Sequence, residues 1–318
     1  MQSDLGAWGL CSDGTQAAPG FRHQAQLCRD RADCLRSALS FAREGASRDE
    51  AISVGVSAPL SVPLRDALGQ SPHVAFFDMT ELGRNPRRII SAMLDFASAH
   101  RGRRLRYVSE PCGPARTAAE QAEAVLHESL LGVALPRYPA SVLCLYNAAE
   151  LDATAVSGAE QTHPVVISGG RSRSSTAYAG PGAVPRQCER PLPPVPPRAV
   201  TVPYRDDLRP VRAQVARRAR EAGLPRGRTA DLTLAVSEVA ANTLRHTSGG
   251  GTLHVWRAAG EIICQIADSG TITDPLVGRR RPAPDASGQG LWVVNQICDL
   301  VELRAGSADT IVRLHMYL

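Results

Sequence analysis

The stretch LTLAVSEVAANTLRHT, residues 232–247, combines a helix pattern with two polar residues beside its apolar stripe. Glu238 and Asn242 are four residues apart, so they share one face of the predicted helix, next to the surface that should be buried. An isolated pair of this kind is typical of a solvated helix face. Its meaning therefore depends on the polar residues that follow it in the chain.

Two later segments also place polar residues or glycines where the apolar pattern predicts core. Asp268 closes an otherwise apolar strand in IADSG, two residues before Gly270. Gly288 and Gly290 open a predicted helix in SGQGLWVV. Backbone N–H groups at a helix N-terminus can contact phosphate, and glycine allows a close approach. Each segment alone is a common turn or loop, but the three in this order favour a nucleotide site.

The residue types suit ATP and Mg²⁺. The amide oxygen of Asn242 is a ligand that a hard Mg²⁺ accepts. Glu238, one helical turn earlier, is placed to accept a proton from an attacking hydroxyl. Asp268, at a strand end, can accept a hydrogen bond from the exocyclic amine of a purine.

This order of motifs resembles the GHKL (Bergerat-type) ATP-binding fold, an α+β sandwich. The resemblance implies that Asn242 holds Mg²⁺ and that the nucleotide is also contacted by Asp268, Gly270, Gly288, Gly290 and Thr310 of ADTIVRL. The segment AVSEVAANTLRHT, which ends in His246 and Thr247, is similar to the N-box of bacterial anti-sigma factors that are also serine/threonine kinases. In that family Glu238 would be the catalytic base. The later segment DPLVGRR, together with the glycine missing before it, resembles a subgroup of actinobacterial anti-sigma regulators that carry an N-terminal sensory domain.

One departure from the family pattern concerns the loop that would close over the nucleotide. The family reads Asp-x-Gly-x-Gly, whereas this chain reads Asp268-Ser-Gly270-Thr-Ile272. A branched residue in place of glycine predicts a stiffer hinge. The loop itself, 271–287, contains three consecutive arginines, and one of them could reach the γ-phosphate. They are Arg279, Arg280 and Arg281.

A proline-rich segment divides the chain of 318 residues. We expect a disordered tail at 1–20, a first domain at 21–180, a stiff linker at 181–197 and a second domain at 198–318. In the first domain, an opening helix over 24–45 is followed by strands that alternate with helices. The predicted strands are 51–57, 73–78, 105–110, 141–147 and 164–169. Such alternation predicts an α/β domain with a mostly parallel sheet that is covered on both faces.

The first domain has no Gly-Lys-Ser/Thr phosphate loop, so no phosphate site is expected there. Five of its segments resemble the MEDS sensory domain, a degenerate RecA-like module of bacterial and archaeal regulators. They are FRHQAQL with His23, SEPCGPARTAAE with Arg116, VLHESLLGVAL with His127 and Glu128, VLCLYNAAEL, and THPVVISGG with His163. The resemblance implies a sensor for a small-molecule or redox signal that the sequence does not identify.

Composition restricts the remaining classes of function. A net charge of +5 is weak support for direct DNA binding, and neither a membrane span nor a signal peptide is found, so we expect a cytoplasmic protein. The eight cysteines contain no C-x-x-C pair and should be reduced. Cys144, Cys264 and Cys298 are expected in cores. The others could be exposed and open to redox sensing or metal binding: Cys11, Cys28, Cys34, Cys112 and Cys188.

Taken together, the sequence predicts an ATP- and Mg²⁺-binding anti-sigma factor in a partner-switching system, controlled by a sensory domain. Its expected partners are an alternative sigma factor and a STAS-type anti-anti-sigma protein that it would phosphorylate on serine or threonine. The related kinases are homodimers, so a dimer is also expected. Two alternatives stay open: an ATP-gated binding protein without kinase activity, and a sensor histidine kinase with His127 as phosphoacceptor.

Overall fold

The computed structural model describes residues 20–69, 71, 73–114, 116–185, 188, 190–283, 288–306 and 309–318. The chain divides between Glu189 and Arg190 into two compact units. The tail predicted for 1–20 lies outside the described residues, except for Gly20. Among the described residues, no helix combines the length and the apolar character needed to cross a bilayer.

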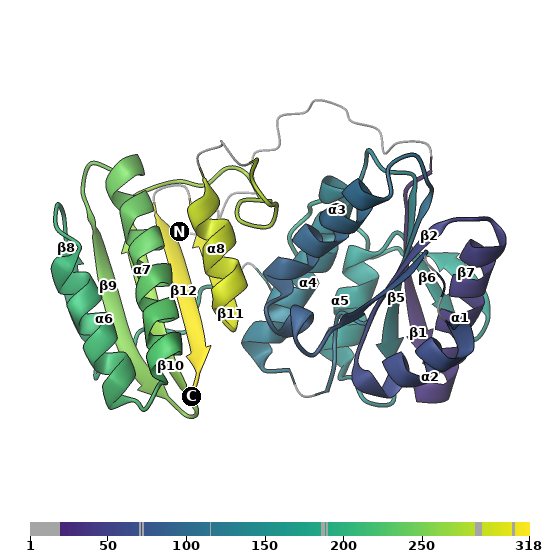
Figure 1. Ribbon diagram of the computed structural model, residues 1–318, viewed down its shortest axis with the longest axis horizontal. Coiled ribbons are helices and arrows are strands. Elements are labelled where there is room, and N and C mark those ends of the chain that lie inside the picture. Colours follow the sequence, from purple (N-terminus) through teal and green to yellow (C-terminus); the bar gives the residue numbers. More distant parts are fainter. Residues whose placement is uncertain are drawn as a thin grey trace. The chain divides into compact units, whose positions relative to one another are not determined.

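The N-terminal unit is built on a seven-stranded sheet with the order β3-β2-β4-β5-β1-β6-β7 (Figure 1). The strands are β1 (Arg22–Cys28), β2 (Ala51–Val56), β3 (Val74–Asp78), β4 (Leu105–Ser109), β5 (Ala140–Asn147), β6 (Val165–Ser168) and β7 (Arg171–Ser174). Neighbouring strands are parallel except for the pair β6 and β7. The predicted α/β domain with a mostly parallel sheet is therefore confirmed.

Helices cover both faces of this sheet. One face is packed by α1 (Arg31–Ser47) and α2 (Ala58–Leu68), whose buried side chains share a core with β2. The other face carries α3 (Ile89–Ala99), α4 (Ala118–Ala134) and α5 (Ala153–Thr162). Two short 3-10 helices, Leu82–Arg84 and Pro86–Arg88, lead into α3. Thr117 and Glu120 form a capping box that starts α4.

The opening helix predicted over 24–45 is wrong over 24–30. Arg22–Cys28 is strand β1, which lies between β5 and β6 inside the sheet. The helix begins only at Arg31, after the side chain of Asp30 caps the backbone N–H of Asp33. The strand was not recognised because polar residues such as His23 are buried in it, which breaks the expected apolar pattern. His23 can be buried because it hydrogen-bonds Glu128 inside the protein. Helix α5 and strand β7 were not predicted.

Two of the cysteine predictions are also wrong. Cys28 and Cys34, expected to be reduced, form a disulfide that joins the end of β1 to the first turn of α1. Cys112 and Cys188, expected to be more exposed, are buried. Cys11 lies outside the described residues.

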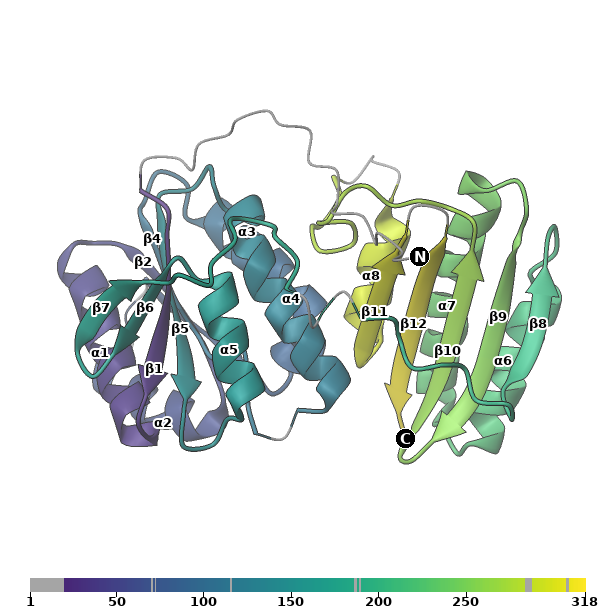
Figure 2. The same ribbon diagram turned by 180° about the vertical axis from the view of Figure 1, so that it is seen from behind.

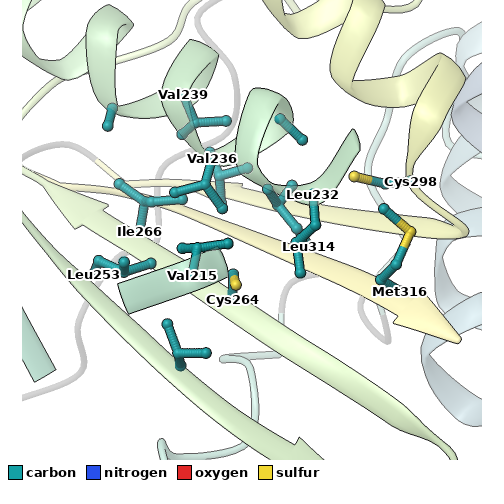
Figure 3. Close-up of a cluster of buried hydrophobic side chains, with 14 of the residues drawn as sticks. Val215, Leu232, Val236, Val239, Leu253, Cys264, Ile266, Cys298, Leu314 and Met316 are labelled. Carbon is teal, nitrogen blue, oxygen red and sulfur yellow. The ribbon is translucent and has the colours of Figure 1, made fainter. Parts of the chain in front are cut away.

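The C-terminal unit is a five-stranded antiparallel sheet, in the order β11-β12-β10-β9-β8, with helices on one face (Figure 1). The strands are β8 (Val200–Tyr204), β9 (Gly251–Ala258), β10 (Glu261–Asp268), β11 (Leu300–Ala305) and β12 (Thr310–Tyr317). The helices are α6 (Arg209–Glu221), α7 (Arg226–His246) and α8 (Gln289–Ile297). Apolar side chains of the helices and of the sheet interlock between the two layers (Figure 3). The predicted separation of antiparallel strands from helices is confirmed.

The opposite face of this sheet is crossed by the chain that leads into β8 (Figure 2). Arg313 on β12 donates hydrogen bonds of 2.6 Å to the carbonyl of Pro193 and of 2.6 and 3.0 Å to Oε1 of Gln265. Part of the segment predicted to be a spacer therefore packs on the C-terminal sheet. Beside it, His315 lies between Glu261 and Glu302, with nitrogen–oxygen distances of 2.9 and 3.0 Å.

The two leucines near the start of the quoted stretch provide a stability test. Leu232 is fully buried in the C-terminal core, whereas Leu234, on the same helix, is 46% exposed. We expect Leu232→Ala to lower the free energy of unfolding by about 2–5 kcal/mol, because a cavity remains, and Leu234→Ala to change it by about 0.5 kcal/mol or less. Urea unfolding followed by the fluorescence of Trp256 and Trp292 measures both. Equal losses would contradict the described packing.

His315 predicts a pH dependence of stability. Burial lowers the pKa of His315, but its bonds to Glu261 and Glu302 outweigh burial and raise the pKa to about 9. A histidine whose pKa is raised on folding contributes its full stabilisation below the unfolded pKa of about 6.5. That stabilisation is lost as the pH rises through 9. We expect the C-terminal unit to lose on the order of 3 kcal/mol across this window.

The variant His315→Gln should largely remove that slope in urea unfolding measured between pH 7 and pH 9. The control His254→Gln should keep it, because burial lowers the pKa of His254 and moves its titration below the window. A slope that persists in His315→Gln would assign it to other groups.

Candidate functional site

Helix α7 carries the polar residues of the quoted stretch beside its buried face. Val236, Val239 and Ala240 of this helix are buried in the C-terminal core. Glu238 and Asn242 flank this apolar face and are half-buried. The sequence therefore places both side chains at the edge of the core, where a ligand can reach them.

Helix α8 faces these two side chains through a glycine. A Cβ added to Gly290 would lie 2.7 Å from Oε2 of Glu238 and 3.6 Å from the amide nitrogen of Asn242. Gly288, which precedes the helix as its N-cap, has a φ of 102°, a left-handed conformation that favours glycine. Both predicted glycines therefore have a structural requirement, and Gly290 borders the acid and the amide.

Asp268 links the end of β10 to α7 and to β12. Its Oδ2 accepts a hydrogen bond of 2.6 Å from the hydroxyl of Thr243, and its Oδ1 accepts one of 2.8 Å from the backbone N–H of Gly270. Thr310, which is opposite Asp268 in the sheet register, donates a hydrogen bond of 2.8 Å to the carbonyl of Gly270. Each carboxylate oxygen keeps a lone pair for a further donor. The half-buried side chain can therefore bind an amine.

Two residues of this network, Tyr204 and Thr243, were not predicted from the sequence. The Tyr204 hydroxyl donates a hydrogen bond of 3.0 Å to Thr243, which in turn binds Asp268. Burial raises the pKa of Tyr204 to about 12, so the phenol stays protonated and can donate. Thr243 directly follows Asn242 in the N-box-like segment and could have been suspected. Tyr204 lies on β8 and only tertiary packing brings it to the site.

The described part of the loop after Asp268, residues 271–283, is held by core packing, an ion pair and a contact with an aromatic ring. Ile272, which replaces the family's second glycine, packs against the C-terminal core. Arg279 is fully buried, Arg280 pairs with Asp274 at 2.6 Å, and the Arg281 guanidinium lies 5.0 Å from the centre of the Trp292 ring. Each of the three arginines is thus either buried or in contact with another side chain of the protein. The later part of the loop, 284–287, lies outside the described residues.

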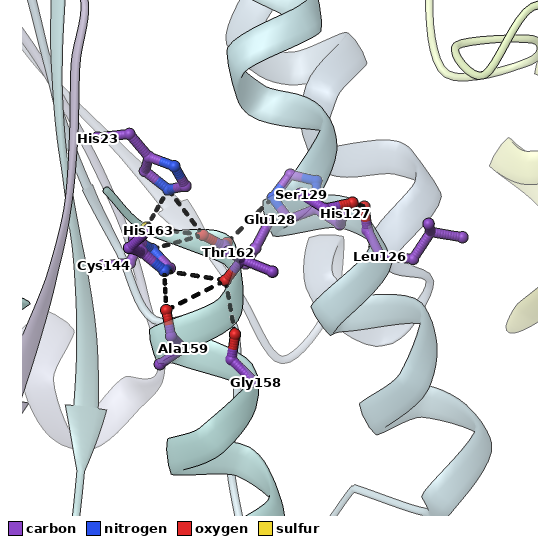
Figure 4. Close-up of polar contacts among 10 residues, drawn as sticks. All are labelled: His23, Leu126, His127, Glu128, Ser129, Cys144, Gly158, Ala159, Thr162 and His163. Carbon is purple, nitrogen blue, oxygen red and sulfur yellow. Dashed lines mark hydrogen bonds and ion pairs between the residues drawn. The ribbon is translucent and has the colours of Figure 1, made fainter. Parts of the chain in front are cut away.

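In the N-terminal unit, residues of the MEDS-like segments form a second polar cluster (Figure 4). His23 on β1, Glu128 on α4 and His163 at the end of α5 meet in the interior, together with Cys144 on β5, which the sequence analysis assigned to the core only. All four side chains are at most 4% exposed. Arg116, which also belongs to the MEDS-like segments, is not part of this cluster. Its guanidinium donates a hydrogen bond of 2.8 Å to the carbonyl of Gly83.

The charges of this cluster follow from its burial. Burial, aided by the nearby His163, lowers the pKa of His23 to about 4, so this ring is neutral at pH 7. Burial alone would raise the pKa of Glu128, but its close contacts with the imidazoles of His163 and His23 hold it well below its usual range. Burial, together with the Glu128 carboxylate, raises the pKa of Cys144 well above its usual range. The cluster thus contains an ionised carboxylate in a water-poor interior.

Comparison with known proteins assigns a family model to a part of each unit. Residues 22–164 match the MEDS family, described as the methanogen/methylotroph, DcmR sensory domain. Residues 203–316 match the family described as the histidine kinase-like ATPase domain. No curated protein matches the chain.

Among solved structures, one similar chain is the crystal structure of the RsbU and RsbW domains of Rv1364c from Mycobacterium tuberculosis. The match has 20% sequence identity and a TM-score of 0.30, and it covers 39% of this chain. It spans 33% of that chain, so about two thirds of it has no counterpart here.

The contact between α7 and α8 makes a specific prediction. Gly290→Ala would place a methyl group against the Glu238 carboxylate, in the space that a bound phosphate would approach. We expect ATP affinity to fall about tenfold or more, which corresponds to about 1.4 kcal/mol. The matched control is Gly227→Ala in the first turn of α7, where an added Cβ meets nothing within 4 Å.

Both substitutions should leave the fold intact, since alanine favours a helix over glycine. Titration with a fluorescent ATP analogue measures the two affinities. Unchanged affinity in Gly290→Ala would exclude this glycine from the nucleotide site.

Proposed function

We propose that this chain, in which a MEDS domain precedes a histidine kinase-like ATPase domain, is a partner-switching regulator that binds ATP with Mg²⁺. Its C-terminal domain, of the GHKL type, would sequester an alternative sigma factor. It would also phosphorylate a serine or threonine of a STAS-type anti-anti-sigma partner. The N-terminal domain, of the degenerate RecA-like type, would adjust this exchange in response to a signal.

The observation that carries the proposal is the convergence of the motifs on helix α7. Glu238 and Asn242 of this helix border Gly290 on α8, and Thr243 of the same helix binds Asp268 on β10. Thr310 on β12 joins this group through Gly270. Segments that are far apart in the sequence thus surround one region with an acid, an amide, a second acid and glycines, which is the set of groups that a nucleotide site needs.

The donor set fits Mg²⁺ and ATP. Oδ1 of Asn242 accepts one hydrogen bond of 2.8 Å, from Arg245, and keeps a lone pair with which it would hold Mg²⁺. When bound, ATP with Mg²⁺ supplies a γ-phosphoryl group whose charge the ion partly neutralises. Asp268 would bind the adenine amine, and the carboxylate of Glu238 would take the proton of the partner's hydroxyl.

The structure bears differently on the two alternatives. The packing of Ile272 against the core favours an ATP-gated binding protein, because an anchored hinge restricts the loop that would close for transfer. The sensor histidine kinase is disfavoured, because the His127 side chain is fully buried and a phosphoacceptor must reach the ATP site.

A phosphotransfer assay tests the proposal. The full chain is incubated with γ-labelled ATP, Mg²⁺ and STAS-type proteins from the same organism, and label is expected on a serine or threonine of one of them. Glu238→Gln keeps the shape of the side chain and removes the base, so transfer should fall about 10²–10⁴-fold while ATP binding persists.

Glu221→Gln, an exposed change on α6, is the control and should transfer label at the normal rate. Full transfer by Glu238→Gln would remove its assignment as base. If no partner of the wild type is labelled although ATP binds, the kinase step is wrong and the gated binder takes its place.

A further inference from the structure

We propose that His23, Glu128, Cys144 and His163 bind a divalent transition-metal ion, with Zn²⁺ as the best fit, inside the MEDS domain (Figure 4). The four residues come from four elements: β1, α4, β5 and the end of α5. They provide two imidazole nitrogens, one carboxylate oxygen and one thiol sulfur. This mixture of nitrogen, oxygen and sulfur donors is the kind that Zn²⁺ takes in proteins.

The spacing of the four donor atoms fits one ion. Oε2 of Glu128 lies 3.0 Å from Nε2 of His23, 3.0 Å from Sγ of Cys144 and 3.1 Å from Nε2 of His163. Sγ of Cys144 and Nε2 of His23 are 3.5 Å apart. Ligands bound about 2.0–2.3 Å from a tetrahedral Zn²⁺ stand about 3.3–3.7 Å from one another. All four donor atoms lie within 4.8 Å of one another, so the most distant pairs would have to approach by up to about 1 Å to complete the site.

The hydrogen bonds of His163 orient its ring as in a metal ligand. Its Nδ1 lies 2.8 Å from the carbonyl of Ala159, which can only accept, so Nδ1 carries the hydrogen. In the neutral ring Nε2 then presents a bare lone pair, and it faces the carboxylate of Glu128. A backbone carbonyl that binds the second nitrogen of a histidine is the usual outer support of a metal-binding imidazole.

Two facing acceptors require a cation or a proton between them. Nε2 of His163 is buried and has no hydrogen-bond partner among the residues that the structure describes, although Oε2 of Glu128 is only 3.1 Å away. A proton on His163 would satisfy this single contact. His23 and Cys144 hydrogen-bond to the same carboxylate oxygen from other elements, so four potential ligand atoms surround one point. A metal ion accounts for all four groups at once.

A cavity borders the cluster at His23. This pocket of about 400 Å³ in the N-terminal unit is also lined by Tyr178 and by Thr162, which is adjacent to His163 in sequence. On binding, the metal–sulfur bond replaces the S–H bond of Cys144, and the proton passes to solvent.

Cobalt is the probe for the test, because a Co²⁺–thiolate bond gives a charge-transfer absorption that carboxylate and imidazole ligands do not. The full chain, without any affinity tag, is treated with a chelator under reducing, oxygen-free conditions and titrated with Co²⁺ alone. We expect about one Co²⁺ per chain, with thiolate charge-transfer and tetrahedral ligand-field bands that added Zn²⁺ abolishes.

Substitutions assign the ligands. Cys144→Ser should remove the charge-transfer band, and His163→Ala should weaken Co²⁺ binding at least about tenfold. The matched controls are Cys188→Ser and His100→Ala, which change another buried cysteine and another histidine of the same unit and should bind as the wild type does. Circular dichroism confirms that each variant is folded.

The wild-type titration decides the proposal even if a variant fails to fold. A folded wild-type chain that binds no stoichiometric Co²⁺, or whose Co²⁺ spectrum lacks the thiolate band, would overturn it. The same holds if Cys144→Ser retains the full spectrum, since the ion would then lie elsewhere.

Discussion

The hydrogen bond between Thr243 and Asp268 ties the helix layer of the C-terminal domain to its sheet where the proposed nucleotide site lies. Tyr204 supports this bond from β8, so the site is braced from the outermost strand. Because Glu238 and Asn242 are on the same rigid helix as Thr243, this one bond helps to set their positions relative to β10. A displacement of α7 would therefore change every proposed contact together.

Burial of charge constrains both domains, and each meets the constraint in its own way. In the C-terminal sheet, His315 lies between two carboxylates, which keep it protonated and bind both of its ring nitrogens. In the N-terminal domain, one carboxylate, Glu128, meets two imidazoles and a thiol. A buried charge without adequate partners is costly, so Glu128 is surrounded by hydrogen-bonding groups, which are also the proposed ligands of a metal ion. The His315 arrangement stabilises a sheet, whereas the cluster around Glu128 is suited to bind the proposed metal ion.

Much of the architecture could be predicted because it rests on local patterns. The alternation of strands and helices in the first domain and the antiparallel strands of the second follow from hydrophobic periodicity. The start of the predicted opening helix, 24–30, was wrong, because β1 buries polar residues such as His23 that hydrogen-bond with residues far away in the sequence. The disulfide of Cys28 and Cys34 was missed for a related reason, since a pairing of cysteines depends on where their backbones lie.

The sequence by itself determined the candidate nucleotide residues Glu238, Asn242, Asp268 and Gly290, because their chemistry and order along the chain are local properties. It also singled out His23, Glu128 and His163, although not what they do together. Only the tertiary structure brought Cys144 to these three, added Tyr204 to the nucleotide site and placed His127 in the interior. The physical reason is that a site is made by atoms within a few ångströms of one another. The strands and helices that carry them are distant in sequence and meet only when the sheet and its helices pack.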